Sequence, residues 1–236
     1  MRDSWRLAVG TLTALPVPPP GRVDRRTARG ALLLAPFAVV PLGVVTALLL
    51  WGGSRTDLPP LAVGFVAVLC LALGTRALHW DGLSDVADGL TASHDRERSL
   101  EVMRTGASGP AGTLAVVLVA GIQAATLAAY VDDVRSAAVA GGLVCLSRCA
   151  LWVVCAQTVP AARPEGLGVA FTGTIPLTVA ALGVLLLGVI PGLVVLALVL
   201  RCRRRLGGVT GDVMGAAIEV ALAAMLLGLA WWPATA

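Results

Sequence analysis

The chain has no lysine and is poor in charged and aromatic residues. All 18 basic residues are arginine, which excludes chemistry that needs a lysine amine, such as Schiff-base formation or a phosphate-loop lysine. Only 14% of the 236 residues are charged, against roughly 25% in a soluble domain. A soluble fold with so few polar residues could not cover its surface. The composition therefore indicates an integral membrane protein.

Aliphatic residues take the place of the missing polar ones. Hydrophobic residues make up 57% of the chain, its mean hydropathy is +0.86, and aromatic residues contribute 4%. Much Ala, Val, Leu and Gly favours helices, and the alternating ten-residue segments of a membrane barrel are not found. The five cysteines form no CxxC pair and are expected to be small buried residues. We predict an all-α, polytopic helical membrane protein with a single domain over residues 1–236.

The hydrophobic residues gather in six long runs. These runs cover roughly residues 31–51, 60–79, 109–131, 136–158, 174–200 and 212–232. Most are close to the ~20 residues that a helix needs to cross a bilayer core. The fifth run is too long for one ordinary span and holds Pro191 and Gly192 in its middle, which suggests a tight turn.

The positions of the arginines predict the topology. They cluster at residues 22–29, 96–104 and 201–205, and such clusters tend to stay on the cytoplasmic side. A turn at Pro191 and Gly192 puts all three clusters on one side. We therefore predict about seven transmembrane helices in the cytoplasmic (inner) membrane, with the N-terminus cytoplasmic and the C-terminal "WWPATA" at the outer interface. Six helices, with a kinked fifth, are the alternative. The unusual residues lie in the inner loops, which predicts an active site at the cytoplasmic face.

The stretch "HWDGLSDVADGL", residues 79–90, carries three aspartates. In a helix, Asp81, Asp85 and Asp88 are spaced i, i+4 and i+7 and share one face. Like charges at this spacing repel, and a cation would relieve the repulsion. Carboxylate oxygens suit Mg²⁺ rather than zinc, and Mg²⁺ usually keeps water and substrate phosphates in its shell. The alternative is a solvated loop that happens to be acidic.

A second pair of acids follows "LGGVTG". Glycines before a helix start let backbone amides approach an anion, so Thr210 and Gly211 are predicted to bind substrate. Asp212 is equally consistent with a metal ligand and with an ordinary helix cap. Glu219 lies about two turns into an apolar run, where an ionisable group is functional by default. We predict that it also binds substrate.

Cations for an anionic substrate lie nearby. Arg96 and Arg104 follow the aspartates, Arg163 precedes "PEGLG", and Gly109 ends the polar loop; we predict that all four bind substrate. For Arg104 a purely topological role is the alternative. His79 is predicted to contact substrate, with an interfacial role as the alternative. Together these residues suggest phosphoryl-type transfer, in which Mg²⁺ neutralises a diphosphate and a carboxylate deprotonates an attacking hydroxyl.

Several motifs resemble those of one family. "LTALPVP", "LHWDGLSDVADG", "LEVMRTGASGPAG", "EGLG" and "LGGVTGDVMGAAIE" resemble, in this order, motifs of the cobalamin synthase family, the adenosylcobinamide-GDP ribazoletransferases. The resemblance runs from about residue 11 to residue 219. It implies a Mg²⁺-dependent membrane enzyme that joins adenosylcobinamide-GDP to α-ribazole or its 5′-phosphate. The products would be adenosylcobalamin, or its phosphate, and GMP.

One stretch departs from the family pattern. After the basic residue, here Arg104, the family usually has Asp-Ser-Arg before a glycine. This chain has Thr105, Gly106 and Ala107 instead. An acid, a hydroxyl and an arginine are missing together, so this chain lacks the side chains through which that stretch would contact substrate in the family.

These observations give each acid an expected role. The predicted metal ligands are Asp81, Asp85, Asp88 and Asp212. The predicted catalytic residues are Asp85 and Asp88, with Asp88 favoured as the base. The expected partners are the two substrates and the lipid bilayer, without nucleic acid. A homo-oligomer and other enzymes of the corrinoid pathway stay open as partners.

Two other functions are alternatives. One is a phospholipid enzyme like the CDP-alcohol phosphotransferases, but its pattern of two aspartates followed by Gly and a later Ala-Arg pair is not matched. The other is a cation- or proton-coupled transporter. Transporters place such groups near the bilayer midplane, often in both halves of a repeat. Here most of the acids lie at one membrane face.

Overall fold

The computed structural model describes residues 1–230, which form helices joined by loops, and no strand occurs among these residues. This confirms the all-α prediction. The helices are α1 (Arg2–Leu12), α2 (Arg25–Ala38), α3 (Val40–Gly53), α4 (Pro60–Gly74), α5 (Leu78–Ala92), α6 (Arg96–Val102), α7 (Pro110–Ala128), α8 (Val134–Leu146), a 3-10 turn (Ser147–Cys149), α9 (Ala150–Val154), α10 (Leu167–Phe171), α11 (Leu177–Leu187), α12 (Val189–Leu206) and α13 (Gly211–Leu229). The "WWPATA" segment, predicted at the outer interface, lies outside the described residues.

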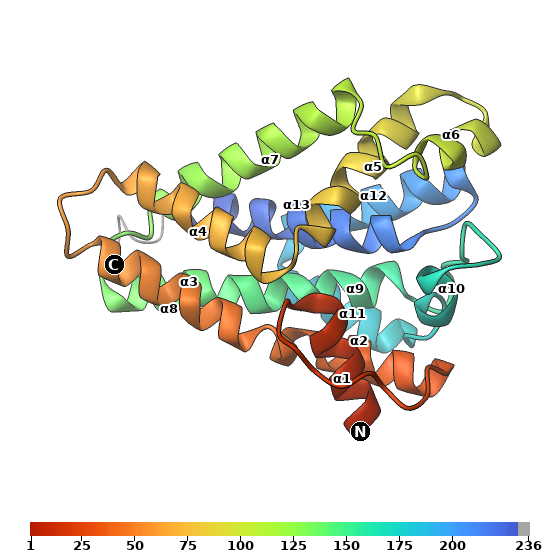
Figure 1. The fold of residues 1–236 in the computed structure, drawn as a ribbon, viewed down its shortest axis with the longest axis horizontal. Helices are drawn as coiled ribbons and strands as arrows, with labels where there is room; N and C mark the ends of the chain where they lie inside the picture. The colour runs from red at the N-terminus through yellow and green to blue at the C-terminus, as the bar shows by residue number, and fades with distance from the viewer. Residues whose placement is uncertain (231–236) are drawn as a thin grey trace.

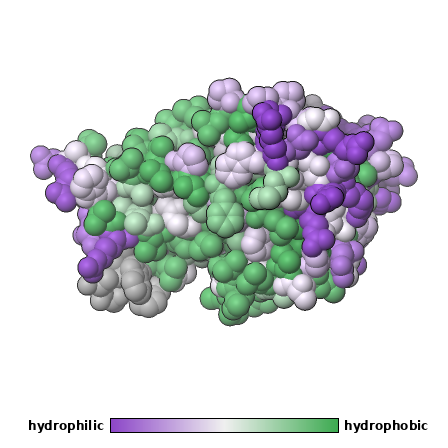
Figure 2. All heavy atoms as spheres, turned by 90° about the horizontal axis from the view of Figure 1, so that it is seen from below, coloured by the Kyte–Doolittle hydropathy of each residue, from purple (hydrophilic) through white to green (hydrophobic). Residues whose placement is uncertain are grey.

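The apolar helices run along the long axis of the molecule, side by side (Figure 1). Within the described chain, four segments are long and apolar enough to cross a membrane: Arg25–Gly53 (α2 and α3), α7, Val134–Val154 (α8 and α9) and α13. Helices α4 and α5 qualify together as a fifth, bent by 93°. In Figure 2 a broad hydrophobic surface lies between two polar ends. These features describe a membrane protein with four or five candidate spans.

The seven predicted spans are not confirmed. The fifth apolar run forms two helices, as predicted, but neither is among the candidate spans. α11 is a short apolar helix, and α12 ends in Arg203, Arg204 and Arg205. A break was expected in this run, but its predicted position at Pro191 and Gly192 is wrong. The chain turns at Gly188, whose φ of +91° suits glycine. Pro191 instead lies in the first turn of α12, where its missing N–H leaves no helix bond unmade.

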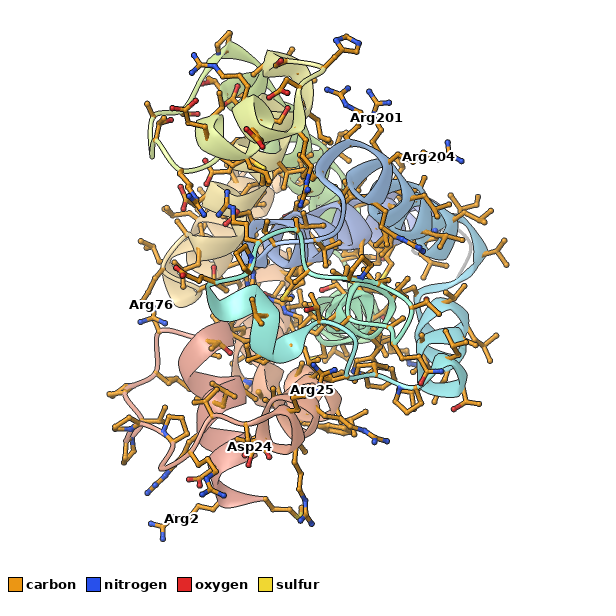
Figure 3. The ribbon with its side chains drawn as sticks, turned by 90° about the vertical axis from the view of Figure 1, so that its right-hand side faces the viewer. Arg2, Asp24, Arg25, Arg76, Arg201 and Arg204 are labelled. Atoms are coloured by element: carbon orange, nitrogen blue, oxygen red, sulfur yellow. The ribbon has the colours of Figure 1, made fainter. Side chains whose placement is uncertain are left out.

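One end of the molecule collects the arginine-rich segments. Figure 1 places α6 and α10 at this end, and Figure 3 looks onto it, with Arg2, Arg76, Arg201 and Arg204 pointing outward. The α2 helix begins at the same end. Its cap is Asp24, whose carboxylate accepts a hydrogen bond from the Thr27 amide at 2.8 Å. That bond lowers the pKa of Asp24 below its usual range.

The sharp bend between α4 and α5 positions the acidic helix. Arg76 and Ala77, at the bend, both have a φ of 55°, a left-handed conformation that costs a non-glycine residue about 1–2 kcal/mol. The loop after α1 holds the bend, because the Ala14 amide donates to the Gly74 carbonyl at 2.6 Å. The Arg76 guanidinium donates to the Gly10 carbonyl at 2.7 Å. The strained bend turns α5 away from α4 and against α13.

Candidate active site

Helices α5 and α13 cross through two glycines. A Cβ atom on Gly82 would lie 2.6 Å from the carbonyl oxygen of Asp212. A Cβ on Gly215 would lie 2.9 Å from the Cα of His79. Any larger residue at either position would therefore push the helices apart. The two backbones approach closely, and the acids of α5 are brought beside the start of α13.

Three of the four predicted metal ligands meet at this crossing. Asp85 is half-buried and feels the negative charges of Asp81 and Asp212, which the positive charge of Arg163 partly offsets. Among residues 1–230, however, no three His, Cys, Asp or Glu side chains converge closely enough to hold a metal by themselves. The cluster can therefore supply only part of a metal's ligand shell.

The fourth predicted ligand, Asp88, serves another helix. Its two carboxylate oxygens accept hydrogen bonds from the backbone amides of Gly109, at 2.7 Å, and Gly112, at 2.9 Å. Both amides belong to the start of α7, where the cap residue Gly109 has no side chain of its own. Asp88 thus caps α7 and is buried there. The roles of Asp88 as metal ligand and as base stay predictions. Substrate binding by Gly109 also stays a prediction, and its backbone amide already donates to Asp88.

A polar cavity of about 200 Å³ lies at the start of α13. Its lining includes the predicted substrate-binding residues Arg163, Thr210 and Gly211, together with Asp212. The Arg163 guanidinium lies 3.9 Å from the Asp212 carboxylate. Thr210 caps α13 and donates from its hydroxyl to the same carboxylate at 3.0 Å. A cation, a helix start and an acid therefore line one small hollow.

The loops around this cavity are tied by backbone hydrogen bonds. The amide of Val209 donates to the Pro160 carbonyl at 3.0 Å, and the amide of Ala162 donates to the Val209 carbonyl at 2.9 Å. Gly208 permits this approach, because a Cβ there would lie 2.4 Å from the Pro160 carbonyl oxygen. The pairing holds Arg163, next in the chain, beside the start of α13.

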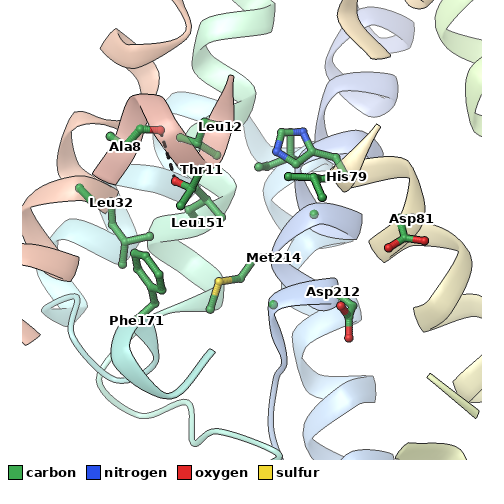
Figure 4. Close-up of a pocket in the computed structure, with 15 residues that line it drawn as sticks. Ala8, Thr11, Leu12, Leu32, His79, Asp81, Leu151, Phe171, Asp212 and Met214 are labelled. Atoms are coloured by element: carbon green, nitrogen blue, oxygen red, sulfur yellow. Dashed lines mark hydrogen bonds between the residues drawn. The ribbon is translucent and has the colours of Figure 1, made fainter. Parts of the chain in front are cut away.

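An apolar cavity of about 220 Å³ adjoins the polar one. Figure 4 shows Leu32, Leu151 and Phe171 on one side of it, with Asp81 and Asp212 on the other. Gly211 and Asp212 line both cavities. Asp212 therefore stands where the two cavities meet, whereas Asp81 lines only the apolar one.

A buried polar network lies behind His79. Its Nδ1 atom is 3.3 Å from a carboxylate oxygen of Glu219, without good hydrogen-bond alignment. The other oxygen of Glu219 accepts a hydrogen bond from the side-chain amide of Gln123 at 2.9 Å. His79 lines the apolar cavity, whereas Glu219 lines neither cavity. Substrate binding by Glu219 therefore stays a prediction. In this structure its carboxylate lies next to the His79 ring.

Arg148, which the sequence analysis overlooked, belongs to the same region. Its side chain is 1% exposed and donates to the Val144 carbonyl at 2.7 Å and to the Ser147 hydroxyl at 2.9 Å. The carboxylate of Glu219 attracts its charge. Gln123 was overlooked too. Each is an isolated polar residue within an apolar run, and this is the signal that could have identified them.

Two predicted substrate-binding arginines line neither cavity. Arg96 donates from its guanidinium to the carbonyls of Leu206, at 2.8 Å, and Ala162, at 2.9 Å. It thereby ties α6 to the end of α12 and to the loop of the polar cavity. The side chain of Arg104 is exposed and, within the part of the chain that the structure describes, makes no hydrogen bond or ion pair. Neither residue lines the two hollows.

Comparison with known proteins places this arrangement in one family. The sequence model described as cobalamin-5-phosphate synthase matches residues 4–230. An adenosylcobinamide-GDP ribazoletransferase of Nocardioides sp. is 64% identical over 98% of this chain and 99% of its own length. Proteins of the same name from Frankia casuarinae (34% identical; 95% of this chain, 93% of the relative) and Stutzerimonas stutzeri (36%; 95% and 96%) are also similar. No solved structure matches. The chain therefore belongs to the cobalamin-5-phosphate synthase family.

Proposed function

We propose that this protein is an adenosylcobinamide-GDP ribazoletransferase, which joins the activated corrinoid to α-ribazole or its 5′-phosphate and releases GMP. The relative from Nocardioides sp., which bears this name and is 64% identical over 98% of this chain, supports the assignment. The observation that carries the mechanism is the position of Asp212, which lines both an apolar and a polar cavity, with Asp81 in the lining of the apolar one. The phospholipid-enzyme and transporter alternatives have no comparable support.

The reaction exchanges one bond to phosphorus for another. The hydroxyl oxygen of α-ribazole attacks the phosphorus that remains attached to the corrinoid. The bond from this phosphorus to the bridging oxygen breaks, and GMP leaves with the electron pair. The hydroxyl proton passes to a carboxylate, for which we propose Asp85. Asp85 is near enough to Asp81 and Asp212 to feel their charges, although it lines neither cavity. Among residues 1–230 no hydrogen bond occupies its carboxylate, whereas both oxygens of Asp88 are occupied.

Mg²⁺ fits the chemistry of the acid cluster. Mg²⁺ is usually held by one or two carboxylates, with substrate phosphates and water completing its shell. Asp81 and Asp212 would hold it, and Arg163, 3.9 Å from Asp212, would bind a phosphate oxygen beside it. When bound, the ion neutralises the diphosphate and stabilises the departing GMP. That fewer than three ligating side chains converge within residues 1–230 agrees with a shell completed by substrate.

We further propose that the arginine-rich end faces the cytoplasm. Arginines favour the cytoplasmic side of the cytoplasmic membrane, and both cavities border loops of this end. Helices α11 and α12 would then enter the bilayer from the cytoplasm and return to it. This orientation puts the N-terminus and the acid cluster on the side where soluble nucleotides are found.

The test is a direct assay with a charge-matched control. Purified protein is given Mg²⁺, adenosylcobinamide-GDP and α-ribazole, and the release of GMP is measured. Asp81→Asn and Asp212→Asn are expected to lose most of the activity. Asp57→Asn makes the same charge change in the exposed α3–α4 connection and is expected to keep it. Absence of GMP release from the folded wild-type protein, with either form of α-ribazole, would refute the proposed function.

A further inference from the structure

We propose that the apolar cavity beside Asp81 and Asp212 receives the methylated benzimidazole base of α-ribazole and selects the base by its shape. This proposal rests on the proposed function for the identity of the nucleoside. It divides the active site into two parts, with an aromatic base in the apolar cavity and phosphates in the polar cavity, and Asp212 in the lining of both.

The chemistry of the lining favours an apolar base. The walls include Leu32, Leu151, Phe171, Met214 and Ile218, and the charged groups, together with His79, stand along one side. A methylated benzimidazole has one ring nitrogen in need of a partner when the other carries the ribose. Guanine has several donors and acceptors, and burying these without partners costs about 1–3 kcal/mol each. The cavity therefore suits the base of the nucleoside and disfavours the guanine of the second substrate.

The hydroxyl group in the wall, that of Thr11, leaves the cavity apolar. Thr11 lies in the wall formed by α1, but its hydroxyl donates to the Leu7 carbonyl at 2.7 Å. A ligand would therefore meet the methyl group of Thr11 or an already occupied oxygen.

The size of the cavity favours one flat ring system. Its volume is about 220 Å³, below the ~300–1,000 Å³ typical of pockets for drug-sized ligands. A corrin macrocycle is larger than such ligands and cannot enter, whereas a two-ring heterocycle is small enough. Two wall residues, Phe171 and Met214, offer the aromatic and thioether contacts that flat rings prefer.

The cavity is preformed and correctly placed. The indole N–H of Trp152 donates to the Leu32 carbonyl at 2.7 Å, which fixes α2 against α9 and holds two walls together. Gly211 and Asp212 are common to both cavities. A base held in the apolar hollow would therefore carry its ribose toward the acids, and any phosphate on the ribose toward Arg163.

The experiment measures binding, so that it does not depend on catalysis. Equilibrium dissociation constants are determined by titration calorimetry for purified protein with α-ribazole and with the same nucleoside lacking both methyl groups. In a fitted hydrophobic pocket one extra methylene changes binding by about 10–200-fold. We expect wild-type protein to bind the methylated nucleoside at least about tenfold more tightly.

Two buried residues of α13 provide a variant that tests the base subsite and a matched control. Ile218 lines the cavity, whereas Leu222, one turn further along α13, does not; both are 1% exposed. In Ile218→Ala the preference for the methylated nucleoside is expected to fall at least about threefold, because a contact with the base is lost. Leu222→Ala truncates an equally buried side chain and is expected to leave the preference unchanged.

A variant that fills the apolar cavity tests the proposal if Ile218→Ala does not fold. Ala31, in the wall formed by α2, is 2% exposed, and Ala31→Leu puts a larger side chain into the hollow. It is expected to weaken α-ribazole binding at least about tenfold and to leave binding of the corrinoid substrate unchanged.

Failure of the base subsite can be distinguished from failure of the proposed reaction. An unchanged preference in Ile218→Ala, or unchanged α-ribazole binding in a folded Ala31→Leu protein, would overturn the base subsite even if GMP is released. Selective binding that depends on Ile218, in a protein that releases no GMP, would support the cavity and overturn the proposed reaction.

Discussion

Replacing Asp88 with asparagine separates two roles for this residue, the capping of α7 and base catalysis. Its two oxygens accept from the amides of Gly109, at 2.7 Å, and Gly112, at 2.9 Å. Asparagine has one acceptor oxygen, so one of these amides would face an NH₂ group. A hydrogen bond to a charged group contributes about 1.5–3 kcal/mol, and the negative charge at a helix start contributes about 0.3–1 kcal/mol more. We expect Asp88→Asn to lower the free energy of unfolding by about 2–4 kcal/mol.

Two measurements read out this effect. Thermal unfolding of purified protein in detergent, followed by helical circular dichroism, reports the loss of stability. Hydrogen exchange of the peptide that contains Gly109 and Gly112 is expected to become faster at the start of α7. Asp81→Asn is the control, because Asp81 is exposed and no hydrogen bond to its carboxylate occurs within residues 1–230.

Opposite outcomes distinguish the two roles. An Asp88→Asn protein with unchanged stability and unchanged exchange, but with kcat lowered by the 10²–10⁴-fold typical of a lost general base, would refute the capping argument. The pattern expected from the structure is the reverse. Stability and exchange change in Asp88→Asn, and the larger loss of kcat belongs to Asp85→Asn.

Three other substitutions probe the helix crossing, the polar cavity and the acid cluster. Gly82→Ala is expected to reduce both stability and activity, since its Cβ would lie 2.6 Å from the Asp212 carbonyl oxygen, whereas Gly121→Ala meets nothing within 4 Å and should be neutral in thermal unfolding. Arg163→Ala is expected to raise KM for adenosylcobinamide-GDP at least about tenfold through the loss of a charge-assisted phosphate contact, and an unchanged KM would exclude that contact. Asp81→Asn is expected to need more Mg²⁺ and to regain part of its activity at high Mg²⁺, so a deficit that is independent of Mg²⁺ would exclude a ligand role.

Local sequence patterns predicted much of the fold. Composition and the lengths of the apolar runs gave an all-helical membrane protein, and the spacing of Asp81, Asp85 and Asp88 correctly placed them on one helix, α5. Both signals depend on neighbouring residues alone. The motifs also predicted the family correctly, because their order along the chain is distinctive.

Features that depend on contacts distant in sequence were missed. The α11–α12 turn was placed at Pro191 rather than at Gly188, since a proline in the first turn of a helix and a proline in a loop look the same in sequence. Arg148 was taken as part of an apolar run, because nothing local indicates a nearby Glu219. The cap on α7 has one usable sequence signal. In "GPAG" the helix begins at Pro110 after the cap residue Gly109, which has no side chain, so an acceptor for the first amides must come from elsewhere.

The three aspartates of α5 show why periodicity alone could not assign their roles. Their spacing gives them a common helix face, but that face meets different neighbours along its length. Near Asp81 the close contact through Gly82 brings in α13 and the apolar cavity. Two turns later, Asp88 reaches the uncapped start of α7. Asp85 lies between these contacts, and among residues 1–230 no hydrogen bond occupies its carboxylate. Asp81 shares this freedom from hydrogen bonds but is assigned to the metal in the proposed reaction, so the proposal leaves Asp85 to accept the proton.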